Sequence, residues 1–223
     1  MKGRGFALTR ERASTSSGPS RRSISQAAGS SDSQFVRLAV AGEAGLVLLA
    51  LGLGRVFGIS PLAQLQPGWR PFLWGVLATS PLLLALIWIL RRPSGPLRRL
   101  VDFVVRELGP VLAGRSAVEL ALLAALAGLG EELLFRGLIQ TGLARLAPGP
   151  LALLCASILF GLAHFATSTY AVVAGMMGLY LGVLFMVQGS LLTPIVTHAL
   201  YDLVALLFVA RRYRASQEGP SLE

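Results

Sequence analysis

Predominantly apolar stretches, separated by short polar segments, fill most of the chain after residue 34. Each stretch is about as long as the 20 or so residues that a helix needs to cross a bilayer. Segments with Pro and Gly, such as 60–70, separate them as loops. The pattern predicts an all-α, polytopic membrane protein with about six transmembrane helices, at 35–58, 71–90, 116–145, 150–167, 170–187 and 191–210.

Residues 91–115 and the two ends of the chain have a different pattern. In 91–115, charged residues alternate with Leu, Val and Phe between Pro96 and Gly109-Pro110, which predicts an interfacial amphipathic helix. Residues 1–34 are rich in Ser, Arg and Gly and contain few large apolar residues, so we expect disorder. The chain is thus divided into a basic tail (1–34), two spans with an interfacial helix (35–115), a helical membrane domain (116–210) and a basic tail (211–223).

The charge distribution gives the expected orientation. Hydrophobic residues make up 54% of the chain and charged residues 14%, and the net charge is +9. Sixteen of the 20 Lys and Arg lie in 1–37, 91–115 and 211–214, which six spans place on one side. This is the positive-inside distribution of a membrane protein and argues against nucleic acid as a partner. We expect both termini to be cytoplasmic, and the Ala/Leu/Gly/Arg-rich composition favours a bacterial plasma membrane. The single Cys155 excludes an intrachain disulfide.

The stretch GLGEELLFRG, residues 128–137, places three ionisable side chains in an apolar helix. Residues four apart share a helix face, so Glu132 can pair with Arg136. Glu131 points elsewhere and has no partner within its own helix. A charge at bilayer depth is costly, so such a set favours a function. A purely architectural ion pair is the alternative for Glu132 and Arg136.

Two histidines add further polar groups to the predicted spans. Phe160 precedes His164 by four residues, and Asp202 follows His198 by four, so Asp202 can accept a hydrogen bond from His198 and orient its ring. If the three helices are neighbours, Glu131 and both histidines can converge on one polar cavity. Such a cavity suits hydrolysis by an activated water, with a second His stabilising the oxyanion. The same groups could instead hold a divalent metal such as zinc, although no HExxH sequence is present.

EELLFR (131–136), FGLAH (160–164) and HALYD (198–202) resemble, in order, the EExxxR, FxxxH and HxxxN/D motifs of the CPBP intramembrane proteases. This is the family of the type II CAAX prenyl endopeptidases and of the bacteriocin-processing and immunity proteins. The resemblance covers about 116–210 and implies that this segment is the catalytic domain. It implies that Glu131 is the general base and His164 its water-activating partner, with Glu132 and Arg136 as a supporting pair. His198 and Asp202 would stabilise the oxyanion or, with Glu131 and His164, bind a metal.

Asp202 stands where many members have Asn, and an ionised Asp cannot donate a hydrogen bond to an oxyanion. The resemblance implies an intramembrane endopeptidase acting on a membrane-associated protein or peptide, of the prenylated CAAX type in the best-known relatives. A non-catalytic membrane scaffold or bacteriocin self-immunity factor on the same fold is the main alternative. A proton-coupled transporter is a third, and the absence of an evident internal repeat counts against it.

Overall fold

The computed structural model describes residues 21–92 and 94–218, and within these ranges it contains helices and no β-strand. A short 3-10 helix, Leu62–Gln64, follows the first long helix, and a π-helix, Leu133–Gln140, continues the fourth. The α-helices are α1 (Arg21–Val56), α2 (Trp69–Arg91), α3 (Gly95–Ala113), α4 (Ala117–Glu132), α5 (Thr141–Leu143), α6 (Gly149–Ala163), α7 (Ser168–Gln188) and α8 (Leu192–Gln217). The predicted all-α fold is confirmed.

Four helices of the described chain are long and apolar enough to span a membrane: Val36–Val56 within α1, α2, α7 and α8. The other two predicted spans, 116–145 and 150–167, are not formed by single α-helices of spanning length. Apolar α6 has 15 residues, and α4 has 16 before the π-helix continues it. The total of six spans therefore stays a prediction.

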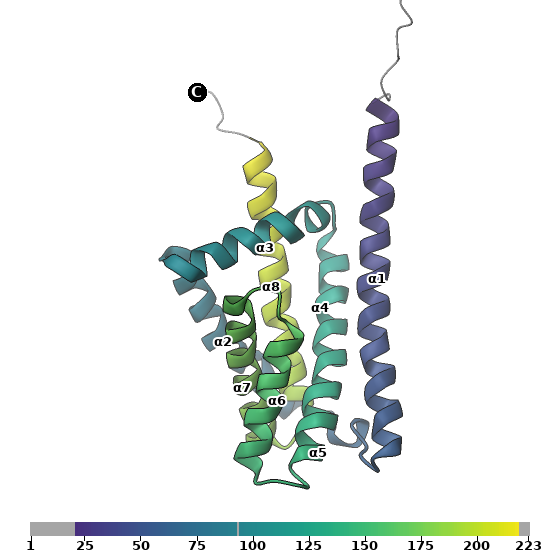
Figure 1. The fold of residues 1–223 in the computed structure, drawn as a ribbon, viewed down its shortest axis with the longest axis vertical. Helices are drawn as coiled ribbons and strands as arrows, with labels where there is room; N and C mark the ends of the chain where they lie inside the picture. The colour runs from purple at the N-terminus through teal and green to yellow at the C-terminus, as the bar shows by residue number, and fades with distance from the viewer. Residues whose placement is uncertain (1–20, 93, 219–223) are drawn as a thin grey trace, which may run out of the picture.

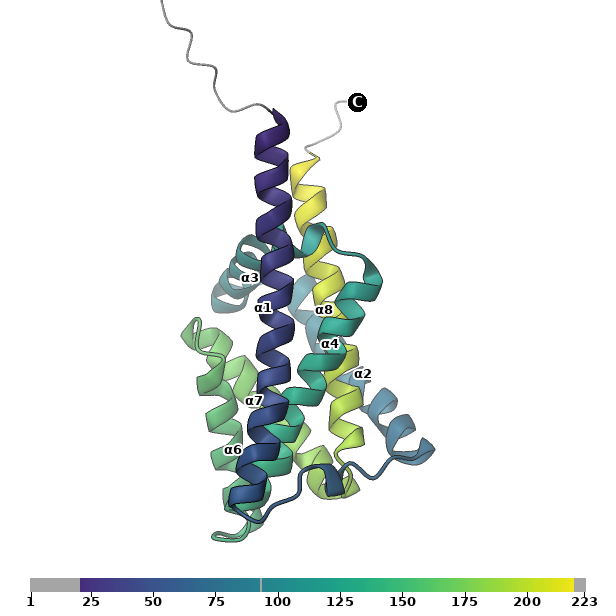
Figure 2. The same ribbon diagram turned by 90° about the vertical axis from the view of Figure 1, so that its right-hand side faces the viewer.

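The bundle is built around α8, which packs against α2, α3, α4 and α7 (Figures 1 and 2). Helix α1 packs along α4 at one edge, and α6 pairs with α7. A Cβ on Gly128 would lie 3.0 Å from the backbone nitrogen of Ala199, so only glycine allows α4 to lie this close to α8. This contact brings the EELLFR helix beside the helix that carries His198.

The predicted interfacial helix is α3, which lies across one end of the bundle (Figure 1). Its apolar side packs on α8, where Leu112 and Val209 are buried in one cluster, and its arginines stay exposed. The helix does not end at Gly109-Pro110 as expected but continues to Ala113. Gly109 allows the ring of Tyr213 to lie against α3, since a Cβ there would be 2.5 Å from that ring.

Several predicted boundaries were wrong. Residues 21–34 are helical and not disordered, because no proline lies between Pro19 and Pro61 and extending a helix costs less than starting one. For the same reason α8 continues through 211–217 of the predicted tail. Residues 1–20 and 219–223 lie outside the described residues. The break between α6 and α7 falls at 164–167, and not at Ser168-Thr169, because Thr167 caps α7 by accepting from the Tyr170 N–H.

The N-terminal end of α1, the C-terminal end of α8 and helix α3 all lie at the same end of the bundle (Figures 1 and 2). The predicted basic segments that the structure describes therefore share one end. The assignment of this end to the cytoplasm remains a prediction.

Candidate active site

The predicted contact between Glu132 and Arg136 is present and buried. Glu132 Oε1 accepts a hydrogen bond from Arg136 Nη1 at 2.7 Å, and the two side chains are 0% and 2% exposed. Glu132 ends α4, and Arg136 lies in the π-helix. The Arg136 carbonyl accepts a hydrogen bond from Oγ1 of Thr141, the first residue of α5. The sequence predicted a regular α-helix here and missed this π-helix. Such wider turns occur frequently at functional sites.

Arg136 joins this pair to helices α6 and α7. Its Nη2 donates to the carbonyl of Gly178 at 2.9 Å, and its guanidinium lies over the Phe160 ring, 4.6 Å from the centroid. A Cβ on Gly178 would lie 3.2 Å from the same ring, so glycine gives the arginine access to this carbonyl beside Phe160. The Phe160 ring thus covers one face of the buried Arg136 guanidinium.

His198 is held by Glu132, which the sequence analysis did not foresee. His198 Nδ1 lies 2.9 Å from Glu132 Oε1, whereas its Nε2 lies 3.5 Å from Asp202 Oδ2. A carboxylate only accepts, so Nδ1 carries the donated proton. The predicted contact between Asp202 and His198 is present at the opposite nitrogen, and Glu132 makes the shorter contact. That Asp202 orients the ring stays a prediction.

His164 lies at the end of α6, where it caps the helix instead of continuing it as predicted. Its Nδ1 donates to the Phe160 carbonyl at 2.8 Å, and the two rings lie 4.5 Å apart between centroids. This hydrogen bond fixes the tautomer of the neutral imidazole. Its free Nε2 is consequently directed at Glu131.

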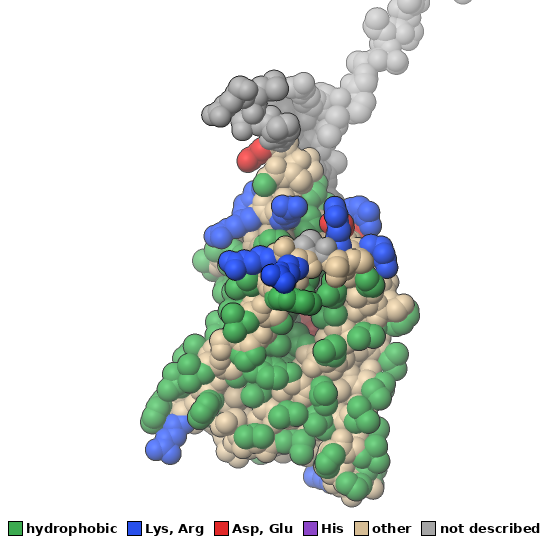
Figure 3. Space-filling model, turned by 90° about the vertical axis from the view of Figure 1, so that its left-hand side faces the viewer, with side chains coloured by type: hydrophobic (Ala, Val, Ile, Leu, Met, Phe, Trp, Pro, Cys, Tyr) green, Lys and Arg blue, Asp and Glu red, His purple; other side chains and the backbone are tan. Residues whose placement is uncertain are grey.

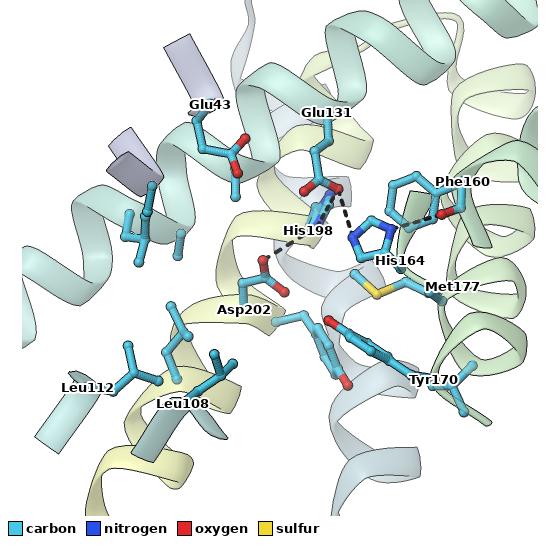
Figure 4. Close-up of a pocket in the computed structure, with 18 residues that line it drawn as sticks. Glu43, Leu108, Leu112, Glu131, Phe160, His164, Tyr170, Met177, His198 and Asp202 are labelled. Atoms are coloured by element: carbon cyan, nitrogen blue, oxygen red, sulfur yellow. Dashed lines mark hydrogen bonds and ion pairs between the residues drawn. The ribbon is translucent and has the colours of Figure 1, made fainter. Parts of the chain in front are cut away.

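Glu131 lies between the two imidazoles (Figure 4). Its Oε2 is 3.6 Å from His164 Nε2 and 3.9 Å from His198 Nε2. This buried oxygen has no hydrogen-bond partner among the described residues. These separations are too long for direct hydrogen bonds but leave the three groups able to share a water molecule.

A cavity of about 260 Å³ opens beside this cluster. Glu131, His164, His198 and Asp202 line it, so the structure brings all four predicted residues to one space (Figure 4). The remaining wall is mainly apolar, with the rings of Tyr170 and Tyr201 and the side chains of Leu108, Leu112, Leu123, Val173, Met177 and Leu206. The cavity therefore places a small polar cluster inside a mainly apolar pocket.

Residues 113–204 match the family model described as type II CAAX prenyl endopeptidase Rce1-like. This segment, called the Rce1-like domain below, is similar to that family. No curated protein and no solved structure matches the chain. The matched segment includes the three sequence motifs and every residue of the polar cluster, which agrees with the resemblance to the CPBP proteases. The family is a protease family of membranes, and with its apolar helices this chain is an integral membrane protein.

Glu43 of α1 lines the cavity from outside the Rce1-like domain, and it belongs to none of the three sequence motifs. Its Oε2 is buried without a hydrogen-bond partner among the described residues. Gly130 allows this approach, since a Cβ there would lie 2.8 Å from the Glu43 carbonyl oxygen. In the sequence, Gly130 indicates that another helix can pack closely here, but it does not identify that helix as α1.

A divalent metal at this cluster is the alternative that the sequence left open. Among the described residues, no group of three His, Cys, Asp or Glu side chains has an arrangement that could hold a metal ion. The His198 Nδ1 atom is engaged by Glu132 and the His164 Nδ1 atom by Phe160, so each ring presents its Nε2 atom to the cavity. Metal-binding imidazoles are held by the same kind of contact. A bound metal therefore stays a prediction of the sequence, and no step below is routed through one.

Proposed function

We propose that this protein is an intramembrane endopeptidase that hydrolyses a peptide bond with a water activated by Glu131 and His164. The observation that carries the proposal is the Oε2 of Glu131, buried and without a partner among the described residues, facing the Nε2 atoms of both histidines. A carboxylate and an imidazole so placed can hold a water and remove its proton.

In the proposed reaction, the water gives a proton to Glu131 while its oxygen attacks the carbonyl carbon of the substrate. The carbonyl oxygen becomes an oxyanion. His198 stabilises it through Nε2–H when the ring is doubly protonated, because Glu132 already engages Nδ1–H. The C–N bond then breaks, and the departing amine takes the proton from Glu131. Glu131 returns to its starting carboxylate, and the products are one carboxyl and one amine.

The proposed substrate is a membrane-associated protein or peptide whose cleaved region is apolar. The mainly apolar cavity wall supports this, since ionic substrate side chains would lose their hydration there. A prenylated CAAX-type substrate follows from the family description alone. In the scaffold or immunity alternative, the same cavity would bind a partner without turnover.

The test is cleavage of a membrane-anchored peptide by the purified protein in liposomes. Glu131→Gln should reduce turnover by at least about 100-fold, the lower range for losing a general base. Glu119→Gln is the matched control on the same helix. Glu119 closes the capping box with Ser116, and glutamine can do the same, so turnover should be unchanged. Normal turnover in Glu131→Gln would contradict the mechanism and favour the scaffold.

A further inference from the structure

A second hollow, of about 640 Å³, lies between the end of α2, helix α3 and the last turns of α8. It is separate from the active-site cavity and shares none of its lining residues. Its inner wall is apolar, formed by Leu90, Val101, Val105 and Phe208. Its rim carries Arg98, Arg106 and Arg212.

The rim has an excess of positive charge. Within the hollow, Asp102 is the one carboxylate among the described residues, and its Oδ2 lies 3.9 Å from Arg98 Nε. Arg106 Nε also has a partner, Glu107 Oε1, which lies 3.4 Å away and outside the hollow. The side chains of both pairs are at least 54% exposed, so the pairs are weak and their arginines remain available. Arg212 has no carboxylate within ion-pair distance in the part of the chain that the structure describes. An anion with several oxygens is the complementary ligand, because guanidinium groups bind phosphate in a bidentate manner.

The hollow lies at the level where lipid headgroups are expected. Trp88, which is 57% exposed, precedes Arg91 by about one turn at the end of α2, and exposed tryptophans mark membrane interfaces. Figure 3 shows Lys and Arg side chains gathered around this end of the molecule, above a broad hydrophobic surface. An apolar wall that leads from a basic rim toward the membrane matches a molecule with one phosphate and a hydrocarbon chain.

We propose that this hollow binds one anionic phospholipid. The phosphate lies among Arg98, Arg106 and Arg212, and an acyl chain lies along the wall of Val101, Val105 and Phe208. The site differs from the general attraction of a basic surface to anionic membranes. It depends on which arginines line the hollow and not on the number of charges at this end.

Native mass spectrometry of the purified full chain, titrated with dioleoyl phosphatidylglycerol or dioleoyl phosphatidylcholine, tests this proposal. The double variant Arg98→Gln/Arg212→Gln should weaken phosphatidylglycerol binding by roughly 25-fold, at about fivefold for each arginine. The matched control is Arg99→Gln/Arg211→Gln, which removes the same charge at the adjacent positions outside the hollow. It should leave binding within about twofold. These side chains are exposed, so thermal unfolding should confirm that both variants fold.

Asp102→Asn gives a change of opposite sign, because it frees Arg98 and removes a negative charge from the rim; binding should tighten several-fold. Glycerol phosphate has the anionic group without acyl chains and should not displace the lipid at equal concentration. Equal weakening in the two double variants would overturn the proposal in favour of general surface attraction. Effective displacement by glycerol phosphate, or equal affinity for phosphatidylcholine, would also overturn it.

Discussion

Glu132→Gln should mainly destabilise the protein, because it leaves the charge of Arg136 buried without its counter-ion. Glutamine keeps one carbonyl oxygen, which can accept from Arg136 or from His198 but carries no charge. The other contacts of Arg136, the Gly178 carbonyl and the Phe160 ring, are also uncharged. The Arg136 side chain is only 2% exposed, so its guanidinium cannot turn to water.

The expected loss in the free energy of unfolding is about 3–5 kcal/mol, the range found when one partner of a buried ion pair is removed. Replacing both partners should cost less. In Glu132→Gln/Arg136→Met the buried charge is gone, and the glutamine that replaces Glu132 can still accept the proton on His198 Nδ1. The double variant should therefore be more stable than Glu132→Gln alone, with a coupling energy above the ~0.5 kcal/mol expected of independent sites.

Unfolding in mixed detergent micelles, followed by circular dichroism, measures all four corners of this cycle. Glu131→Gln is the companion variant, with the same substitution one residue earlier. Glu131 Oε2 has no hydrogen bond to lose within the described structure, so stability should change by less than about 1 kcal/mol. A Glu132→Gln variant as stable as the wild type, or a double variant less stable than either single, would refute the electrostatic reasoning.

Three further outcomes are expected. Asp202→Asn should retain proteolysis in liposomes, because Glu132 still holds His198 Nδ1; loss of activity would mean that the carboxylate itself is required. Deleting residues 1–34 should leave membrane fractionation and proteolysis unchanged, because the apolar part of α1 begins at Val36; failure to insert would contradict this. A reporter fused after residue 223 should read as cytoplasmic, given the basic segments at that end of the bundle, and a signal from the other side would reverse the orientation.

Features that depend on helix periodicity and on the length of apolar segments could be predicted from the sequence. The Glu132–Arg136 contact follows from a four-residue spacing, and that spacing survives the change to a π-helix at Leu133. The apolar lengths were enough for an all-α membrane fold. The helix ends were harder, because α1 and α8 extend into polar segments where no proline stops them and composition alone favours disorder.

Contacts between distant segments could not be predicted in the same way. Glu132 and His198 are 66 residues apart, and no local pattern indicates that α4 and α8 meet with this rotation. Glu43 lies on a helix outside the matched domain, and it reaches the cavity because Gly130 lets α1 pack closely. Such contacts depend on which small residues face each other, and the sequence has many glycines from which to choose.

The contact between Glu132 and His198 also explains why residue 202 can differ from the common Asn. If Asp202 alone oriented His198, exchanging a carboxylate for an amide would change the tautomer of the ring. Glu132 instead accepts from Nδ1–H in a fully buried position, where it also accepts from Arg136. Residue 202 contacts only Nε2, at 3.5 Å, and its side chain is 29% exposed at the cavity wall. The residue that holds the His198 ring is therefore Glu132, within EELLFR. A substitution at position 202 would instead change the polarity beside His198 Nε2, where the proposed oxyanion forms.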